Sequence, residues 1–313
     1  MRTFLTWTVL AAAALAACGS VSDVGPASAP SNAGSTSAGG AGLAAGDTNS
    51  AGLAGNRCSG VLPQGGNSGQ SGAGGAAGRE TGGSGGGPLI DARFKLVWRD
   101  DFDSFDDARW SKQTHTFDEN LAHFAASNVV VEGGLLKLRV TKAPSADREY
   151  AAAEVATKET FTYGRFAGRI RFCAGSGMVS SLFTYQQDVA VSWQEMDIEY
   201  LGKLTNPNRV QYNLISGTAA NRVYQPKVVA APGSATEEFH DYALEWAPEG
   251  ITFFIDGVQT WKDVQPKIKD AQTLHMNAWP ANDAVTQFAG AFDAGSVPCE
   301  AQYDWVEAYR YSP

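Results

Sequence analysis

The fold of this chain is decided by the stretch Trp193-Gln194-Glu195-Met196-Asp197-Ile198-Glu199-Tyr200. Successive side chains of a β-strand point to opposite faces, and polar and apolar residues alternate here, so the stretch predicts a strand. One face carries Trp193 and three carboxylates, and the other carries Met196, Ile198 and Tyr200. We therefore expect one face in a core and one acidic face outside it.

The acidic face has a simple alternative, a solvated sheet surface that needs no explanation. Trp193 on the same face argues against it, because a large indole favours a partner over water. Two carboxylates beside a flat aromatic suit glycoside hydrolysis, in which one attacks the sugar and the other protonates the leaving oxygen. The Cα atoms of Glu195 and Glu199 lie about 13 Å apart along a strand. A retaining pair needs carboxyl groups about 5 to 5.5 Å apart, so this face must be concave.

Short alternating segments continue through the chain from about residue 88. Gly133-Gly134 and Asp256-Gly257 each separate two of them, and such pairs predict two-residue hairpins because glycine readily adopts positive φ. No helical periodicity stands out, so the chain is predicted to be all-β, an antiparallel two-sheet sandwich. The expected strands are 94–99, 128–132, 135–141, 163–172, 179–185, 209–216, 239–246, 251–255, 258–261, 273–279 and 302–311.

The first residues are typical of export. Arg2 precedes an apolar run over residues 4–15 that is too short to span a bilayer. The run ends in a sequence that resembles a bacterial lipobox, which predicts a lipoprotein signal peptide over 1–17 and a lipidated Cys18; an ordinary secretory signal is the alternative. Residues 18–87 are rich in Gly, Ala and Ser and are expected to be a disordered tether before a domain over 88–313. We expect an exported protein of the cell envelope, anchored to a membrane or secreted.

Charge and cysteine content narrow the partners. The formal net charge is −9, whereas a nucleic-acid partner requires a basic surface, so we expect none. Export permits disulfides. Cys173 ends one expected strand and Cys299 precedes the last, so we expect these two to be bonded, which leaves Cys58 in the tether. The cysteine and histidine spacings match no zinc pattern.

Glu195-Met196-Asp197-Ile198-Glu199 resembles the E-x-D-x-E signature of glycoside hydrolase family 16. Within that family the chain is similar to the bacterial β-1,3-1,4-glucanases, or lichenases. Further similar blocks occur in the family's order at 177–185, 210–213, 239–246, 276–279 and 303–306. The resemblance implies a concanavalin A-like jelly roll whose concave cleft binds a β-glucan polysaccharide.

The resemblance also implies roles for the three carboxylates. Glu195 would be the nucleophile of a double displacement, Glu199 the general acid and then base, and Asp197 the residue that tunes the pair. Glu199 must hold a proton near neutral pH, so neighbouring negative charge and a closed cleft should raise its pKa.

The implied activity is endo-hydrolysis of β-1,4 bonds in mixed-linkage β-1,3-1,4-glucan. Only Ile198 separates Asp197 from Glu199, whereas many laminarinases and agarases of the family carry an extra residue that forms a β-bulge. Three alternatives stay open: a β-glucan transglycosylase, another family specificity such as laminarin or xyloglucan, and a non-catalytic glucan-binding lectin.

Several residues match the family's sugar contacts. Phe183 and Tyr185 share one face of their expected strand, but the sequence leaves open whether that face is the core face. Trp279 also fits a core position. Two departures leave the linkage preference open: Ala156 stands where lichenases usually have an arginine, and residues 114–124 do not align with the lichenase loop. The matched contacts are Trp193, Phe183, Tyr185, Glu154, Gln211, Asn213, Asn277 and Trp279.

No cofactor is expected for the chemistry. Gly134 and Asp304 match two ligand positions of a structural calcium ion that is common in the family, so such an ion on the convex face is a further expectation. We also expect a monomer.

Overall fold

The structure, a computed structural model, describes residues 90–186, 188 and 191–313. The predicted signal peptide, the lipidation site Cys18 and the tether lie outside the described residues. Within the described part of the chain, no helix is long and apolar enough to cross a membrane.

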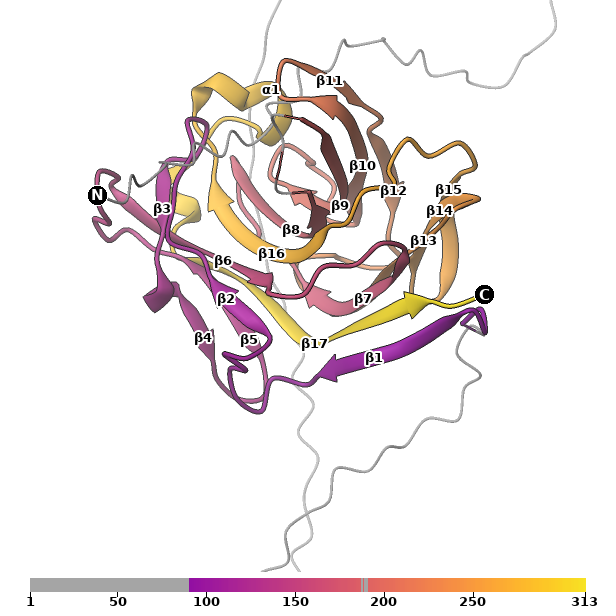
Figure 1. Ribbon diagram of the computed structural model, residues 1–313. Helices are drawn as coiled ribbons and strands as arrows, with labels where there is room; N and C mark the ends of the chain where they lie inside the picture. Colours follow the sequence, from indigo (N-terminus) through magenta and orange to yellow (C-terminus); the bar gives the residue numbers. More distant parts are fainter. Residues whose placement is uncertain (1–89, 187, 189–190) are drawn as a thin grey trace, which may run out of the picture. The chain divides into compact units, whose positions relative to one another are not determined.

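Two antiparallel sheets form the domain (Figure 1). The outer sheet has the order β15-β14-β13-β7-β17-β5-β4. In addition, β1 pairs with the C-terminal half of β17. Its strands are β1 (Phe94–Asp100), β4 (Val129–Val131), β5 (Leu136–Val140), β7 (Gly164–Arg171), β13 (His240–Ala247), β14 (Gly250–Ile255), β15 (Val258–Asp263) and β17 (Cys299–Tyr311).

The inner sheet has the order β11-β10-β9-β8-β16-β6-β2, with β12 also on β10 and β3 parallel to β6. Its strands are β2 (Trp110–Lys112), β3 (Ala122–Phe124), β6 (Tyr150–Thr157), β8 (Met178–Tyr185), β9 (Trp193–Leu201), β10 (Arg209–Thr218), β11 (Asn221–Tyr224), β12 (Lys227–Ala230) and β16 (Thr273–Pro280). Four short helical turns connect strands: η1 (Ala126–Asn128), η2 (Asp283–Val285), α1 (Thr286–Ala289) and η3 (Ala294–Ser296).

The main hydrophobic core lies between the sheets. Met196 and Ile198 of the inner sheet belong to the same buried cluster as Phe166, Leu244 and Val306 of the outer sheet. Figure 1 shows β10, β9, β8, β16 and β6 bending into an arc, with β7, β17 and β1 outside it. The outer sheet therefore covers the convex side of the inner sheet and leaves its concave side for function.

The predicted sandwich is confirmed, and every expected strand has a counterpart. Gly133 and Gly134 have φ of 65° and 70°, and Asp256 and Gly257 have φ of 46° and 77°, so both predicted hairpin turns are present. The sequence prediction missed β2, β3, β6, β11 and β12. Strand β6 was not predicted because Ala-rich Tyr150–Thr157 has low β-propensity. The strand is also buried on both faces, so its sequence shows no polar and apolar alternation.

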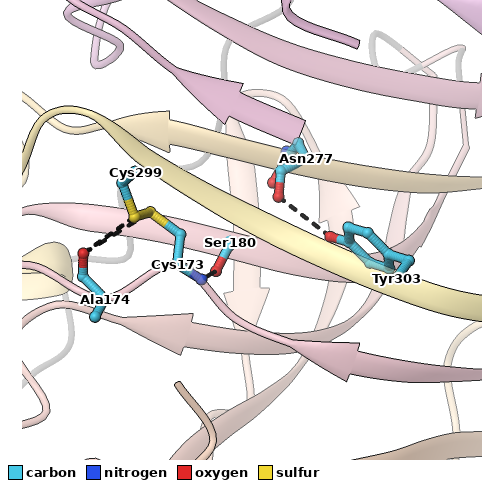
Figure 2. The surroundings of a disulfide bond; sticks show 6 residues. All are labelled: Cys173, Ala174, Ser180, Asn277, Cys299 and Tyr303. Atoms are coloured by element: carbon cyan, nitrogen blue, oxygen red, sulfur yellow. Dashed lines mark hydrogen bonds between the residues drawn. A yellow bond between two sulfur atoms is a disulfide. The ribbon is translucent and has the colours of Figure 1, made fainter. Parts of the chain in front are cut away.

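Cys173 and Cys299 form a disulfide with Cα atoms 5.7 Å apart, as predicted (Figure 2). The bond joins the segment after β7 to the first residue of β17. Nearby, the Tyr303 hydroxyl of β17 crosses the core and donates to the Ser181 carbonyl oxygen at 2.8 Å, with the Asn277 carbonyl oxygen at 3.4 Å. The outer sheet thus supports the backbone of β8 and β16 from beneath the concave face.

Candidate active site

The two faces of β9 separate as the alternation predicts. Met196, Ile198 and Tyr200 are buried in the main core. Trp193 belongs instead to a second cluster on the concave side, together with Phe183, Tyr185 and Ile215. Leu182 is in the main core, so the parity left open for β8 is settled, and Phe183 and Tyr185 face the carboxylates' side.

Strand register places the predicted site residues in rows, because directly opposed residues share a face of the sheet. The first row contains Glu199. Ser181 opposes Glu199 and Asn277 on either side, Glu154 opposes Asn277, and Gln211 opposes Glu199. Five strands thus contribute one polar side chain each to this row.

The next two rows carry the other carboxylates. Asp197 lies opposite Phe183 and Asn213, and Phe183 lies opposite His275. Glu195 lies opposite Tyr185 and Ile215. Of the predicted contacts, all but Trp279 and Trp193 therefore lie in the three rows that hold Glu195, Asp197 and Glu199.

The polar residues of the first row are linked by hydrogen bonds. The Ser181 hydroxyl donates to Asn277 Oδ1 at 2.6 Å, and Asn277 Nδ2 donates to Glu154 Oε2 at 3.1 Å. The Gln211 side chain donates to Glu199. Glu199 Oε2 is buried and has no hydrogen-bond partner among the described residues. This oxygen is available to a ligand, whereas its neighbours are held in place.

Glu195 accepts a hydrogen bond from Trp193 Nε1 at 2.8 Å and another from Asp197. Burial raises the pKa of Glu195, while these two bonds act to lower it. Burial also raises the pKa of Asp197 well above its usual value, and the charges of Glu195 and Glu199 raise it further. A proton shared between Glu195 and Asp197 is therefore favoured on Asp197, which can donate it in a hydrogen bond to an ionised Glu195.

Glu199 has the opposite character. Burial and the charge of Glu195 raise its pKa to about 8, although the Lys203 charge and the Gln211 hydrogen bond lower it. Glu199 therefore holds a proton at neutral pH. The site combines a carboxylate held ionised by donors with a carboxylic acid that has one oxygen free of internal bonds, the division of roles that general-acid catalysis with a nucleophile requires.

Sequence reasoning missed His275. Its ring lies 4.9 Å from the ring of Phe183, and its Nδ1 lies 3.4 Å from Glu154 Oε1. Burial acts to raise the pKa of Glu154, but the close contact and charge of His275, with smaller contributions from His115 and Asn277, hold it below its usual value. Glu154 is therefore a charged acceptor on the concave face. The signal in the sequence was parity, because His275 is two residues before Asn277 on the same strand.

Two further residues on β11 were missed. Tyr224 lies opposite Ile215, in the row of Glu195, and Arg222 lies opposite Gly217, in the row of Trp193. The prediction contained no strand at this position, so it could not place them on the concave face.

Trp279 shares the parity of Asn277 but is 6% exposed and belongs to the main core. Its ring packs edge-on against Phe117, at 4.9 Å between ring centroids. Phe117 comes from the segment that does not align with lichenases. The core position that the sequence also allowed is therefore what the structure describes for this residue.

The predicted calcium ligands lie beside the pairing of Leu136 with Tyr303, Gly134 in the turn before β5 and Asp304 in β17. Asp304 Oδ2 is 3.7 Å from Arg169 Nε. Calcium takes six to eight oxygen ligands, and the described residues contain no group of three or more side chains suited to a metal. Calcium also accepts backbone carbonyl oxygens, which are not among these side chains, so the calcium ion stays a prediction and we derive no step through a metal.

Comparisons with known proteins identify the family of the chain. The family model for glycosyl hydrolases family 16 matches residues 111–307. The β-glucanase of Brevibacillus brevis is 33% identical over 217 residues, which cover 68% of this chain and 80% of that protein. The solved structure of a prokaryotic β-1,3-1,4-glucanase (lichenase) derived from a mouse hindgut metagenome is 31% identical, with a TM-score of 0.61 over 68% of this chain and 98% of that one.

The laminarinase of Rhodothermus marinus is 25% identical, with a TM-score of 0.61 over 70% of this chain and 98% of that one. Fold, site and comparisons point to one conclusion: the chain belongs to glycosyl hydrolases family 16 and is a lichenase-like glycoside hydrolase.

Proposed function

We propose that this protein is a retaining endo-β-glucanase that hydrolyses β-1,4 bonds in mixed-linkage β-1,3-1,4-glucan by double displacement. The observation that carries the proposal is the unequal environment of two carboxyl groups on one concave face. Donors from Trp193 and Asp197 favour an ionised Glu195, and burial beside that charge raises the pKa of Glu199 to about 8.

In the first step, a Glu195 oxygen attacks the anomeric carbon and forms a glycosyl ester. The bond from that carbon to the leaving oxygen breaks, and Glu199 transfers its proton to the leaving sugar. In the second step, Glu199, now ionised, takes a proton from water while the water oxygen attacks the same carbon. Glu195 leaves as a carboxylate, and the anomeric configuration is retained after two inversions.

Asp197 has a supporting role between these two groups. Because its pKa is raised well above the usual value, it keeps its proton and donates a hydrogen bond to Glu195. That bond favours the ionised nucleophile before attack and stabilises the carboxylate that leaves in the second step. Asp197 thereby keeps the proton off Glu195 without removing it from the site.

The linkage preference rests on the unbroken strand. β9 pairs with β8 and β10 without a register shift from Glu195 to Glu199, so a single residue separates Asp197 from the acid. Similarity to the hindgut lichenase and to the Brevibacillus β-glucanase supports mixed-linkage glucan. Similarity to a laminarinase keeps β-1,3-glucan as the second candidate.

The test is cleavage of barley β-glucan, lichenan, laminarin, xyloglucan and agarose by the full-length protein, followed as new reducing ends. We expect cleavage of the first two only, with the β-anomer appearing first in proton NMR spectra. Preferred cleavage of laminarin would replace the linkage assignment, and an initial α-anomer would overturn double displacement. Glucan binding without cleavage would indicate a lectin. Longer chains formed without an increase in reducing ends would indicate a transglycosylase.

We also propose that the chain is exported and anchored to a membrane of the bacterial envelope through a lipid on Cys18. The support is the apolar run at residues 4–15 followed by Leu15-Ala16-Ala17-Cys18. Cys18→Ser should move the protein from the membrane fraction to the soluble fraction. Unchanged fractionation would refute the anchor and leave the enzyme assignment intact.

A further inference from the structure

The aromatic face expected to meet a sugar is covered by a cation. Trp193 is only 1% exposed, and the guanidinium carbon of Arg222 lies 4.6 Å from the centroid of its ring. Gly217 stands between the two residues in register. It has φ of 120°, and a Cβ there would lie 2.2 Å from the Asn221 carbonyl oxygen, so no side chain blocks the path of Arg222 to the indole. A ligand above Trp193 therefore meets Arg222 first.

Arg222 has an unused donor at this position. Its Nη1 is buried and has no hydrogen-bond partner among the described residues. The guanidinium carbon also lies 5.8 Å from the centroid of the Tyr224 ring. A buried donor without a partner destabilises the protein by about the free energy of its desolvation. A ligand that accepts a hydrogen bond from this donor offsets that loss. A neutral polyol with several hydroxyl groups is suited to accept such a bond.

A matching acceptor comes from the opposite edge of the sheet. Glu119 lies between β2 and β3, whereas Arg222 is on β11, and these strands are at opposite ends of the inner sheet. Glu119 is fixed by a hydrogen bond from Asn282 N to its carbonyl oxygen at 2.9 Å, yet its Oε2 is buried without a partner. Burial raises the pKa of Glu119, while a backbone hydrogen bond to its carboxyl group and the charge of Arg222 act to lower it.

We propose that Arg222 and Glu119 hold one glucosyl unit of the substrate between them, beside Trp193 and the nucleophile, as a two-sided sugar clamp. The inference rests on the proposed β-glucan substrate. A sugar hydroxyl accepts from Arg222 Nη1, and a neighbouring hydroxyl donates to Glu119 Oε2, so one ring satisfies both unpaired atoms. The two edges of the sheet are then joined through the substrate.

The test compares Arg222→Met, Glu119→Ala and the double variant. Methionine keeps an unbranched side chain over the indole but removes every donor. We expect KM for mixed-linkage glucan to rise about tenfold in Arg222→Met and about fivefold in Glu119→Ala, since losses of this size lie within the net range of a single hydrogen bond that forms in exchange for water. Because both residues hold one sugar, the double variant should resemble Arg222→Met and fall well short of the fiftyfold product. The kcat should change by less than about twofold, since binding is what is lost.

A matched pair exists in the outer sheet. Arg99 lies 4.5 Å from the centroid of the Trp305 ring, and its Nη1 bonds Glu307 Oε1 at 2.7 Å. Arg99→Met and Glu307→Ala remove the same chemistry away from the concave face and should leave KM unchanged. Melting temperatures of all variants separate unfolding from lost binding.

Unchanged KM in Arg222→Met, or additive effects in the double variant, would overturn the clamp while wild-type glucan cleavage still stands. If the wild type cleaves no glucan, the proposed function fails. Oligosaccharide affinities of the wild type and Arg222→Met, measured by calorimetry, then decide the clamp on their own: a tenfold loss supports it, and equal affinities reject it.

Discussion

The two faces of β9 have the same backbone and the same neighbouring strands, yet they have opposite consequences for the molecule. The convex face places Met196, Ile198 and Tyr200 in the main core, where burial of apolar surface stabilises the fold. The concave face places Glu195, Asp197 and Glu199 side by side, where burial raises the pKa of each carboxyl group. One face of the strand stabilises the site, and the other holds groups that are unfavourable together.

The contrast teaches that the rigidity of this site comes from outside it. The Tyr303 hydroxyl bonds the backbone of β8 from the outer sheet, and Ser181 and Asn277 fix the row around Glu199. Because the core face is fully packed, the strand can keep three carboxyl groups in register. Substitutions on the two faces should therefore separate activity from stability.

The largest effect is expected at Glu195. Glu195→Gln keeps the size of the side chain but removes the nucleophile, so glucan cleavage should fall by about a thousandfold or more. Steady-state rates of new reducing ends measure it, and Glu237→Gln, at an exposed position, is the control. A variant with near wild-type rates would remove the catalytic role from this face.

The opposite face should give the opposite result. Ile198→Ala leaves a cavity in the core and should lower the free energy of unfolding by about 2 to 5 kcal/mol, measured by urea denaturation. The kcat of the molecules that remain folded should stay close to the wild-type value. Val258→Ala, at an exposed residue of β15, should leave stability unchanged. A large loss of kcat in Ile198→Ala would show that the two faces are not separable.

The raised pKa of Glu199 predicts a pH-dependent stability. The folded protein binds this proton with a pKa of about 8, compared with 4.5 for an ordinary glutamate, so folded molecules hold more protons than unfolded ones between these values. The contribution is fully present below pH 4.5 and is lost as the pH rises through 8. Glu199→Gln should therefore be more stable than the wild type at pH 9, with a smaller difference at pH 5. If the difference in melting temperature between the two proteins is the same at pH 5 and pH 9, the raised pKa is contradicted.

The smallest effect is expected at Trp193, which contributes one donor to Glu195. Trp193→Phe keeps a ring but removes Nε1, so kcat should fall about tenfold, the size expected for a bond to a charged group. Tyr185→Phe, which keeps the ring packed against Trp193, is a comparison for the loss of a neighbouring polar group. No change in kcat would assign the stabilisation of ionised Glu195 to Asp197 alone.

Sequence reasoning reached the strand that carries the catalytic row because period-two alternation encodes both faces of a half-buried strand directly. It reached Glu154, Gln211, Asn213 and Asn277 through the family resemblance. It overlooked His275, although this residue shares the parity of Asn277. It could not place Arg222 or Glu119, since their position on the concave face depends on which strands are neighbours. Strand order and register are set by contacts between distant segments, and β6 and β11 carry no local signal of either.

The central claim is that Glu195 is the nucleophile that forms the covalent glycosyl-enzyme. One measurement tests this claim directly. The full-length protein is incubated with a 2-deoxy-2-fluoro-β-glucan oligosaccharide bearing a good leaving group, which slows the second displacement. Mass spectrometry of the protein and its peptides should show one added glycosyl unit on the peptide at Glu195, absent in Glu195→Gln. A glycosyl unit on Glu199, or turnover with retained anomeric configuration in Glu195→Gln, would contradict the account.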